Sequence, residues 1–257
     1  MTCIAVVPDA HCHFELSNER FTWLGNMLVD IWPDVIVNLG DLCDFPSLSS
    51  YDKGMKTFEG KRYKHDIAIT HDALDKMDKP FNDFNNKRKN IRKGQRKLPR
   101  KIITLGNHEF RLFRAVEKQA ELEGIISIDD LKYKEHGYEV IPFKKPIEVE
   151  GITFCHYFPS GVKGESISGF NIASNLIAKN MVSSVCGHSH LYDLAVRAKP
   201  SGQKVMGLCA GWYGEQPTYS DATEQMWSSG ISILKDVHEG VYDLEFYSIN
   251  RIKRLYS

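Results

Sequence analysis

The sequence predicts an α/β protein built on two mixed β-sheets that lie in contact. In the first half of the 257-residue chain, buried strands alternate with helical segments, which is the pattern of a parallel sheet. The second half is a series of short apolar or alternating segments, so it is mostly β. No low-complexity linker divides the halves and no segment repeats. We therefore expect one domain over residues 1–257, with an insertion at about 45–100.

A βαβ unit opens the chain. Residues 3–7 and 34–39 are continuous apolar runs, which are typical of strands that are covered on both faces. Between them, apolar residues at 21, 24, 28 and 31 recur at helical spacing, with Ser17 as a potential N-cap and Pro33 as the stop. The two strands are therefore expected to be parallel neighbours.

A third buried strand is predicted at 102–105, where Gly106 ends it and a helix over 110–121 follows. Downstream, a helix is expected at 171–179. Further strands are expected at 138–141, 146–150, 152–155, 183–186, 191–198, 204–208, 231–235 and 241–249.

The insertion differs in character from its surroundings. Its first part, to Gly60, is polar and is expected to loop over the surface, and residues 66–77 have a helical pattern that Pro80 punctuates. The following stretch, Lys87–Lys101, contains nine cations and no acidic residue. Its cations recur every four residues, so on a helix they would form two adjacent basic rows. A solvated helix face and an anion-binding face are both consistent with that pattern.

Bulk composition excludes several classes of protein. Lys plus Arg and Asp plus Glu are equal at 33 each, so net charge does not indicate a polyanionic partner. No apolar run is long enough for a membrane span, and the chain enters a strand without a charged leader. Its six cysteines form no CxxC pair, which favours free thiols in a reducing compartment. A cytoplasmic protein without a membrane partner is expected.

Polar residues follow five of the predicted strands. The carboxyl ends of strands are where open α/β sheets place their ligands. An isolated Asp or His at such a point is often a turn former or a cap, but five sets in the same context indicate one shared site. Mixed imidazole and carboxylate ligands suit Mn, Fe or Zn better than Ca. The five sets are Asp9-x-His11, Gly40-Asp41-x-x-Asp44, Gly106-Asn107-His108-Glu109, His156 and Gly187-His188-x-His190.

This ordered set resembles the calcineurin-like metallophosphoesterase superfamily over residues 8–190. The GNHEFR pattern, with the late Tyr213, Tyr219 and Trp227, is similar to bacteriophage and prokaryotic members, for which the compartment would be the host cytoplasm when the protein is phage-encoded. The resemblance implies a four-layer αββα fold, in which two mixed sheets pack as a sandwich with helices on the outer faces.

The resemblance also implies a ligand set for two divalent metal ions, with Mn first and Fe or Zn as alternatives. Asp9, His11 and His190 would bind the first ion. Asn107, His156 and His188 would bind the second, and Asp41 would bridge the two. Two such ions about 3.5–4 Å apart clamp a phosphate and lower the pKa of a water, so that hydroxide attacks the phosphate ester.

Two further residues are assigned catalytic roles by the resemblance. His108 would donate a proton to the leaving oxygen, and Asp44 would orient and charge that imidazole. A loop cap is the alternative for Asp44, and Glu109 is expected to support its loop rather than take part in chemistry.

Substrate contacts are less directly encoded. Phe45 stands where phosphoprotein phosphatases carry an arginine, so Arg111 or His13 would have to supply the missing contact. Arg88 and Arg92, in the basic run, would neutralise backbone phosphates. Trp212 and Tyr213 would stack on a base or ring, with core packing as the alternative.

The predicted function is therefore that of a dinuclear metal-dependent phosphoesterase, a hydrolase. Its substrate class is open between two possibilities, and a non-enzymatic function is the third. The basic run favours a phosphodiesterase or nuclease acting on DNA or RNA. A phosphomonoesterase, or phosphatase, acting on a nucleotide or phosphoprotein is the alternative that the neutral net charge favours. A non-catalytic binding module that keeps the fold is a third class, against which the complete ligand set argues.

Overall fold

The computed structural model describes residues 1–216 and 224–257. In that part of the chain, strands form one six-stranded and one five-stranded sheet. The strands are β1 (Thr2–Val7), β2 (Val35–Asn38), β3 (Arg100–Thr104), β4 (Tyr138–Ile141), β5 (Ile147–Val149), β6 (Ile152–Phe154), β7 (Ser183–Cys186), β8 (Tyr192–Ala198), β9 (Lys204–Ala210), β10 (Gly230–His238) and β11 (Val241–Ser248). The helices are α1 (Glu19–Ile31), α2 (Tyr63–Lys87), α3 (Phe110–Lys118), α4 (Ile172–Asn180) and α5 (Ile249–Tyr256).

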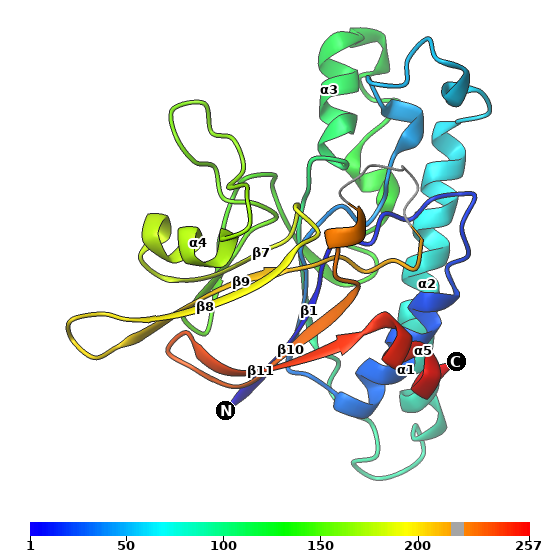
Figure 1. Ribbon diagram of the computed structural model, residues 1–257. Coiled ribbons are helices and arrows are strands. Elements are labelled where there is room, and N and C mark those ends of the chain that lie inside the picture. The colour runs from blue at the N-terminus through cyan, green and yellow to red at the C-terminus, as the bar shows by residue number, and fades with distance from the viewer. Residues whose placement is uncertain (217–223) are drawn as a thin grey trace.

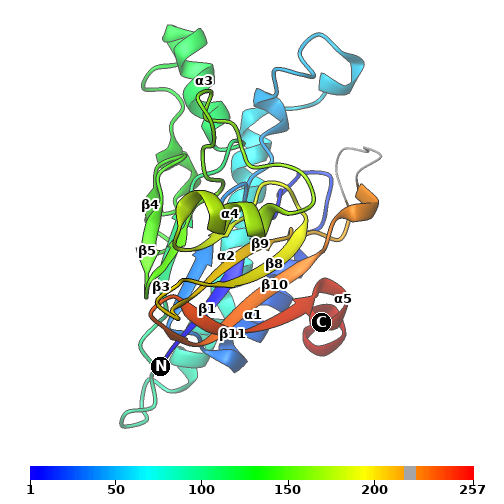
Figure 2. The ribbon, with the colours of Figure 1, turned by 60° about the vertical axis from the view of Figure 1, so that its left-hand side comes forward.

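Both sheets are mixed. The first has the order β11-β10-β1-β2-β3-β4. Strands β1 to β4 are parallel to one another, and β10 pairs antiparallel with β1 on one side and with β11 on the other. The second has the order β5-β6-β7-β9-β8, with β6, β7 and β9 parallel and an antiparallel strand at each edge. Figures 1 and 2 show the two sheets face to face.

Alternation along the strands builds the layers. In β1, Ile4 and Val6 enter a core between the sheets, where they join Phe154 and Leu208 of the second sheet. Ala5 and its alternate neighbours enter a different core, beneath α1, α2 and α5. A third cluster packs α4 against the other side of the second sheet. The predicted two-sheet sandwich with helices on its outer faces is confirmed.

Helix α2 is longer than its sequence predicts. It continues through Pro80 to Lys87, so the predicted stop at the proline is wrong. A proline inside a helix costs roughly 3 kcal/mol. Packing offsets this cost because Met77 and Phe81, on either side of the proline, are both buried against α1. Gly25 of α1 allows the close approach, since a Cβ there would lie 2.6 Å from the Met77 carbonyl oxygen.

The basic run does not form helical rows. Helix α2 ends at Lys87, the next residues form turns, and β3 begins at Arg100. Like charges four residues apart disfavour a helix, and Gly94 and Pro99 punctuate the stretch. The turns precede β3, at the amino edge of the first sheet, and appear as the teal loop at the bottom of Figure 1.

Two helical segments differ from the pattern in smaller ways. Helix α3 ends at Lys118 and not at the predicted residue 121, and its Phe113 is 45% exposed. Helix α5 was not predicted, because its sequence is strongly charged; Ile249 and Ile252 attach it to the core and the Ser248 hydroxyl accepts a hydrogen bond from the Arg251 N–H. Among the described helices, none combines the length and apolarity that a bilayer span requires.

Candidate metal centre

All five sets of polar residues meet at one edge of the sandwich. Asp9, Asp41 and Asn107 follow the parallel strands β1, β2 and β3, so they emerge at the same end of the first sheet. His156 and the His188–His190 segment follow the parallel strands β6 and β7 of the second sheet. Side-chain contacts between the two sets show that they face each other.

Asp9, His11 and His190 form a first group whose ligand atoms lie within 4.8 Å of one another. The His11 Nε2 and His190 Nε2 atoms are 3.0 Å apart. The His11 Nδ1 lies 3.3 Å from Asp44 Oδ1, to which it donates when it carries the proton. The His11 Nε2 then offers a lone pair to the group, an arrangement in which a carboxylate orients a metal-binding imidazole.

A second group contains Asp41, His156 and His188. The His156 Nδ1 is 2.8 Å from the Leu39 carbonyl oxygen and donates to it. On the other side of the ring, His156 Nε2 lies 3.0 Å from Asn107 Oδ1 and 3.3 Å from Asp41 Oδ2. The His156 Nδ1 is also 3.6 Å from Asp9 Oδ1, so the two groups adjoin.

The electrostatics of this cluster favour positive charge. Burial disfavours a charged imidazole, yet the carboxylates of Asp41 and Asp9 raise the pKa of His156 to about 10. Burial raises the pKa of Asp9 to about 6, against the opposing effect of His156. Burial and the charge on His156 lower the pKa of His188 to about 4. A bound cation would take the place of the proton on His156. Two buried carboxylates with imidazoles and an amide oxygen then fit divalent cations of the Mn, Fe and Zn type.

His108 and Asp44, the pair for which catalytic roles are predicted, adjoin the two groups. The His108 Nδ1 lies 2.9 Å from Asp44 Oδ1 and 2.7 Å from the Asp44 carbonyl oxygen. Burial alone would raise the pKa of the Asp44 carboxyl, but hydrogen bonds from His108 and His11 hold it well below its usual value. Asp44 therefore stays ionised at neutral pH. An Arg111 Nη2 is 3.3 Å from the His108 Nε2.

The backbone of the site is strained in several places. His11, Asp41, Phe45, His188 and His190 all have positive φ, between 45° and 72°. Non-glycine residues rarely adopt this conformation, and such outliers gather at functional sites because the surrounding structure must hold them. The strain supports the view that these loops are shaped for ligand geometry.

Two glycines leave room for the carboxylates. A Cβ at Gly106 would lie 2.0 Å from Asp41 Oδ1, and a Cβ at Gly187 would lie 2.1 Å from Asp9 Oδ2. Any side chain at either position would displace a candidate ligand. The carboxylate positions therefore depend on these glycines.

Glu109 connects two of the loops. Its buried carboxylate accepts hydrogen bonds from the backbone N–H groups of Gly106, Asp41 and Leu42, at 2.8–2.9 Å. The Tyr133 hydroxyl donates a further bond at 3.1 Å. The expected supporting role of Glu109 is confirmed by these contacts. Tyr133 was not anticipated, since no local pattern links it to a loop 24 residues away.

The structure brings the predicted substrate contacts to different places. Arg111 lies at the centre, where its Nη1 donates to the carbonyl oxygens of Asp44 and Phe45. His13 is buried and stacks on Phe14, and it belongs to none of the ligand groups found among the described residues. Trp212 stacks behind His190, with ring centroids 6.0 Å apart.

Three predicted contacts lie elsewhere. Tyr213 is fully buried and its hydroxyl donates to the Arg20 carbonyl oxygen, so core packing, the alternative, describes it. Arg88 covers the Phe84 ring and Arg92 lies in the turns at the amino edge of the first sheet, opposite the candidate ligands. Their predicted contact with substrate at this centre is therefore not supported. Tyr219 lies outside the described residues.

The cysteines beside the ligands are buried thiols. Burial raises the pKa of Cys12 and Cys155 to about 12, so both stay protonated at neutral pH. Cys43 and Cys186 are likewise buried and free. These four cysteines therefore behave as small apolar residues of the core.

Comparisons with known proteins return structural similarity alone. No family model matches the chain, and no curated protein matches its sequence. Similar structures include TT1561 of Thermus thermophilus, with 9% identity and a TM-score of 0.44 over 96% of this chain and 99% of that one. Another is Yfce, a phosphoesterase from E. coli, with 13% identity and a TM-score of 0.41 over 96% of this chain and 100% of that one.

Proposed function

We propose that this chain is a phosphoesterase whose centre holds two divalent metal ions. One observation carries the proposal. Two adjoining groups of buried or partly buried ligands direct lone pairs and carboxylate oxygens at one another, with His11 Nε2 and His190 Nε2 only 3.0 Å apart. Two imidazole lone pairs at that distance require a cation or a proton between them. Structural stability alone gives no reason for such an arrangement.

Asp9, His11 and His190 would hold one ion, and Asn107, His156 and His188 the other, with Asp41 between them. When bound, such ions polarise phosphate oxygens and lower the pKa of a water, which makes a nucleophile available near neutral pH. The chain itself supplies the geometry, because Asp44, the Leu39 carbonyl and the backbone N–H of His188 fix the ligands from behind.

His108 is placed to move a proton at Nε2. Its Nδ1 is held by Asp44, so Nε2 is the atom that faces the centre, 3.9 Å from Asp41 Oδ2. When both ring nitrogens carry protons, the Arg111 guanidinium must turn from Nε2 toward an anion. Arg111 and His108 would then contact the phosphate ester from the same side, one binding a phosphate oxygen and the other protonating the leaving oxygen.

The structure bears on the class of substrate. The basic run on which a nucleic-acid substrate was predicted lies at the amino edge of the first sheet, whereas the candidate ligands lie at the carboxyl edge. A long polyanion would have to span the molecule to use both. We therefore favour a compact phosphate ester, as in the phosphomonoesterase alternative.

The test is hydrolysis of p-nitrophenyl phosphate and bis-p-nitrophenyl phosphate by metal-stripped protein after addition of Mn, Fe or Zn, with metal binding followed by calorimetry. We expect two equivalents of Mn to bind and turnover to return. Asp41→Ala should lose both. His108→Ala should keep metal binding but lose about 10²–10⁴-fold in kcat, because it removes only the proton donor. His238→Ala, at an exposed position on β10, is the control and should match the wild type.

The two remaining possibilities have distinct outcomes. Metal binding without turnover of any ester would favour the binding-module class. A failure to bind Mn, Fe or Zn would overturn the proposal, since the geometric argument is about cations.

A further inference from the structure

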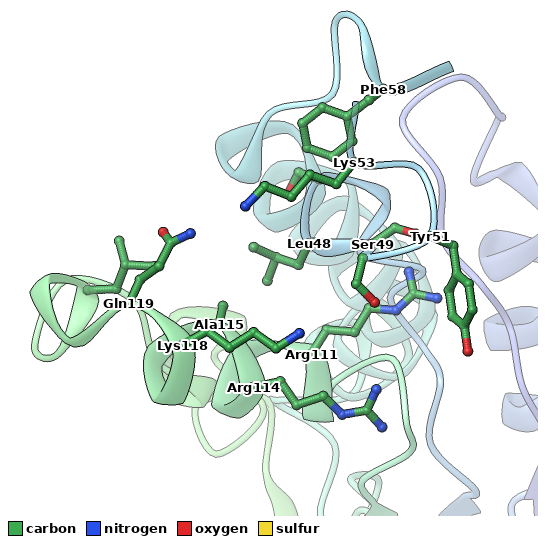
Figure 3. Close-up of a pocket in the computed structure, with 13 residues that line it drawn as sticks. Leu48, Ser49, Tyr51, Lys53, Phe58, Arg111, Arg114, Ala115, Lys118 and Gln119 are labelled. Atoms are coloured by element: carbon green, nitrogen blue, oxygen red, sulfur yellow. The ribbon is translucent and has the colours of Figure 1, made fainter. Parts of the chain in front are cut away.

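A pocket of about 340 Å³ lies beside the candidate metal centre. It opens between α3 and the segment 47–58, which precedes α2 (Figure 3). Leu48, Ala115 and Leu122 form apolar parts of its wall, and Tyr51 and Phe58 bring aromatic rings to it. A volume of this size suits a small ligand and not a folded partner.

The charged lining of the pocket is entirely basic. Its cations are Lys53, Arg111, Arg114 and Lys118, and none of its described lining residues is Asp or Glu. Three of these cations lie at positions i, i+3 and i+7 of α3, which is one face of a helix. Figure 3 shows Arg111 and Lys118 reaching into the gap from α3, with Lys53 and Phe58 on the side across from them.

The charges of the pocket are not neutralised by ion pairs with the protein. Within residues 1–216 and 224–257, no ion pair involves any of the four cations. The nearby Asp52 forms its ion pair with Lys61, at 2.9 Å. Like charges three and four residues apart on one helix face repel each other. A neutralising anion would remove that repulsion.

Arg111 joins the pocket to the centre. It lines the pocket, and its Nη2 is 3.3 Å from His108 Nε2. A ligand whose one phosphate lies at His108 would therefore extend directly past Arg111 into the pocket. The part of such a ligand that occupies the pocket would therefore be covalently joined to the phosphate at His108.

We propose that this pocket binds the part of the substrate beyond the phosphate that is hydrolysed, and that this part is a nucleotide carrying a second phosphate. The inference rests on the proposed phosphoesterase function. Arg114, Lys118 and Lys53 would bind the second phosphate, since guanidinium and ammonium groups match its charge. Tyr51 or Phe58 would stack on the base. A singly phosphorylated peptide supplies no second anion for these cations.

Binding to the metal-free full chain separates the pocket from catalysis. The probes are ADP, AMP and adenosine, with binding measured by calorimetry in the presence of a chelator. We expect ADP to bind about tenfold or more tightly than AMP, and adenosine to bind weakest. Arg114→Gln and Lys118→Gln, both at exposed positions, should each weaken ADP binding about tenfold and flatten its salt dependence. Arg254→Gln, an exposed cation on α5, should not.

Kinetics of the Mn-loaded enzyme supply a second readout. The kinetic substrate is adenosine 3′,5′-bisphosphate, in which both phosphates are esters. We expect Lys118→Gln to lower the ratio of its kcat/KM to that for p-nitrophenyl phosphate by about tenfold, because the nitrophenyl ester has no second phosphate. Equal affinities for ADP and adenosine, or tighter binding of an oligonucleotide or phosphopeptide than of ADP, would overturn the inference. Turnover of p-nitrophenyl phosphate with no ADP binding would overturn the inference and leave the phosphoesterase proposal standing. ADP binding with no turnover of any ester would overturn the phosphoesterase proposal, and with it the role of the pocket as a substrate site, and would leave a nucleotide-binding pocket alone.

Discussion

At the scale of single residues, the site depends on buried side chains that touch no substrate. Glu109 gathers backbone N–H donors from two separate loops, and Asp44 holds two imidazoles at once. Such contacts fix ligand geometry to within the few tenths of an ångström that metal binding requires. Changes to them should therefore affect metal binding without altering any ligand.

Glu109→Gln tests this dependence. Burial and the nearby charge of Asp41 raise the pKa of Glu109, while its N–H donors oppose that shift. A glutamine amide would direct its NH₂ at one of those donors. We expect a loss of about 2–3 kcal/mol in the free energy of unfolding and a 10–100-fold loss of Mn affinity, measured by urea titration and calorimetry. Tyr133→Phe, which removes one donor, should cost only about 1 kcal/mol. Wild-type Mn affinity in Glu109→Gln would contradict the argument.

Asp66 predicts a pH-dependent stability. It is fully buried, and its Oδ2 accepts hydrogen bonds from the Ser47 hydroxyl and N–H. Its Oδ1 has no hydrogen-bond partner within residues 1–216 and 224–257. Burial raises its pKa to about 6. Because the folded-state pKa exceeds the unfolded value, ionisation costs stability; the cost is absent below the unfolded pKa, grows up to about pH 6 and is constant above it.

Asp66→Asn should remove that cost. We expect the variant to gain on the order of 1–2 kcal/mol in free energy of unfolding over the wild type near neutral pH, and to lose that advantage as the pH falls toward about 4. Urea titrations of both proteins across this range give the measurement. A difference that does not change with pH would show that the carboxyl is not the cause.

At the scale of elements, α1 and α2 approach each other closely at Gly25. Gly25 lies against Met77 and Pro80, where an added Cβ would come within 2.6 Å of a backbone oxygen and 2.9 Å of the proline ring. A carbonyl oxygen in a helix cannot move away independently. The close approach therefore requires glycine, although glycine lowers the propensity of α1.

Gly25→Ala should therefore destabilise the protein despite its better helix propensity. Overpacking costs about 1–3 kcal/mol, and the propensity gain of up to about 1 kcal/mol offsets only part of it. Chemical denaturation measures the net loss. Thr22→Ala, at a partly buried position of the same helix, is the control and should change stability by less than about 0.5 kcal/mol. A net gain for Gly25→Ala would mean that the helices separate freely.

At the scale of the whole molecule, the centre links the two sheets. Asp9, Asp41 and Asn107 come from the first sheet, and His156, His188 and His190 come from the second. A cation bound between them stabilises the folded state relative to a chain in which these residues are scattered. Unfolding of the sandwich should therefore respond to metal.

Addition of Mn to the metal-stripped protein should raise its Tm by about 10–20 °C when both sites are filled. At a concentration one hundred times the Kd, each site contributes about 2.7 kcal/mol, and a protein of this size gains about 2–4 °C per kcal/mol. Differential scanning calorimetry gives the shift. Asp41→Asn should show little or none, whereas His238→Ala should match the wild type. An equal shift in Asp41→Asn would place the metal elsewhere.

Local sequence pattern was sufficient to predict the sandwich of strands and the candidate ligands. Apolar runs mark β1 to β3, β6 and β7, and the polar residues directly after them must emerge at the strand ends. Arg111, close behind the third of these strands, was predicted to lie near the phosphate, and the structure puts it beside His108.

Other properties depend on packing between distant segments, and these emerged from the three-dimensional arrangement alone. Pro80 remains in α2 because the residues on both sides of it pack against α1. Tyr213 is a core residue because its ring packs against Phe21 and its hydroxyl donates to the Arg20 carbonyl oxygen. The basic run was predicted to contact the substrate, but it lies at the opposite end of β3 from the candidate ligands. The basic pocket arises only where α3 meets the segment 47–58. Local periodicity encodes which face of an element is apolar, whereas proximity between segments is set by how the layers pack.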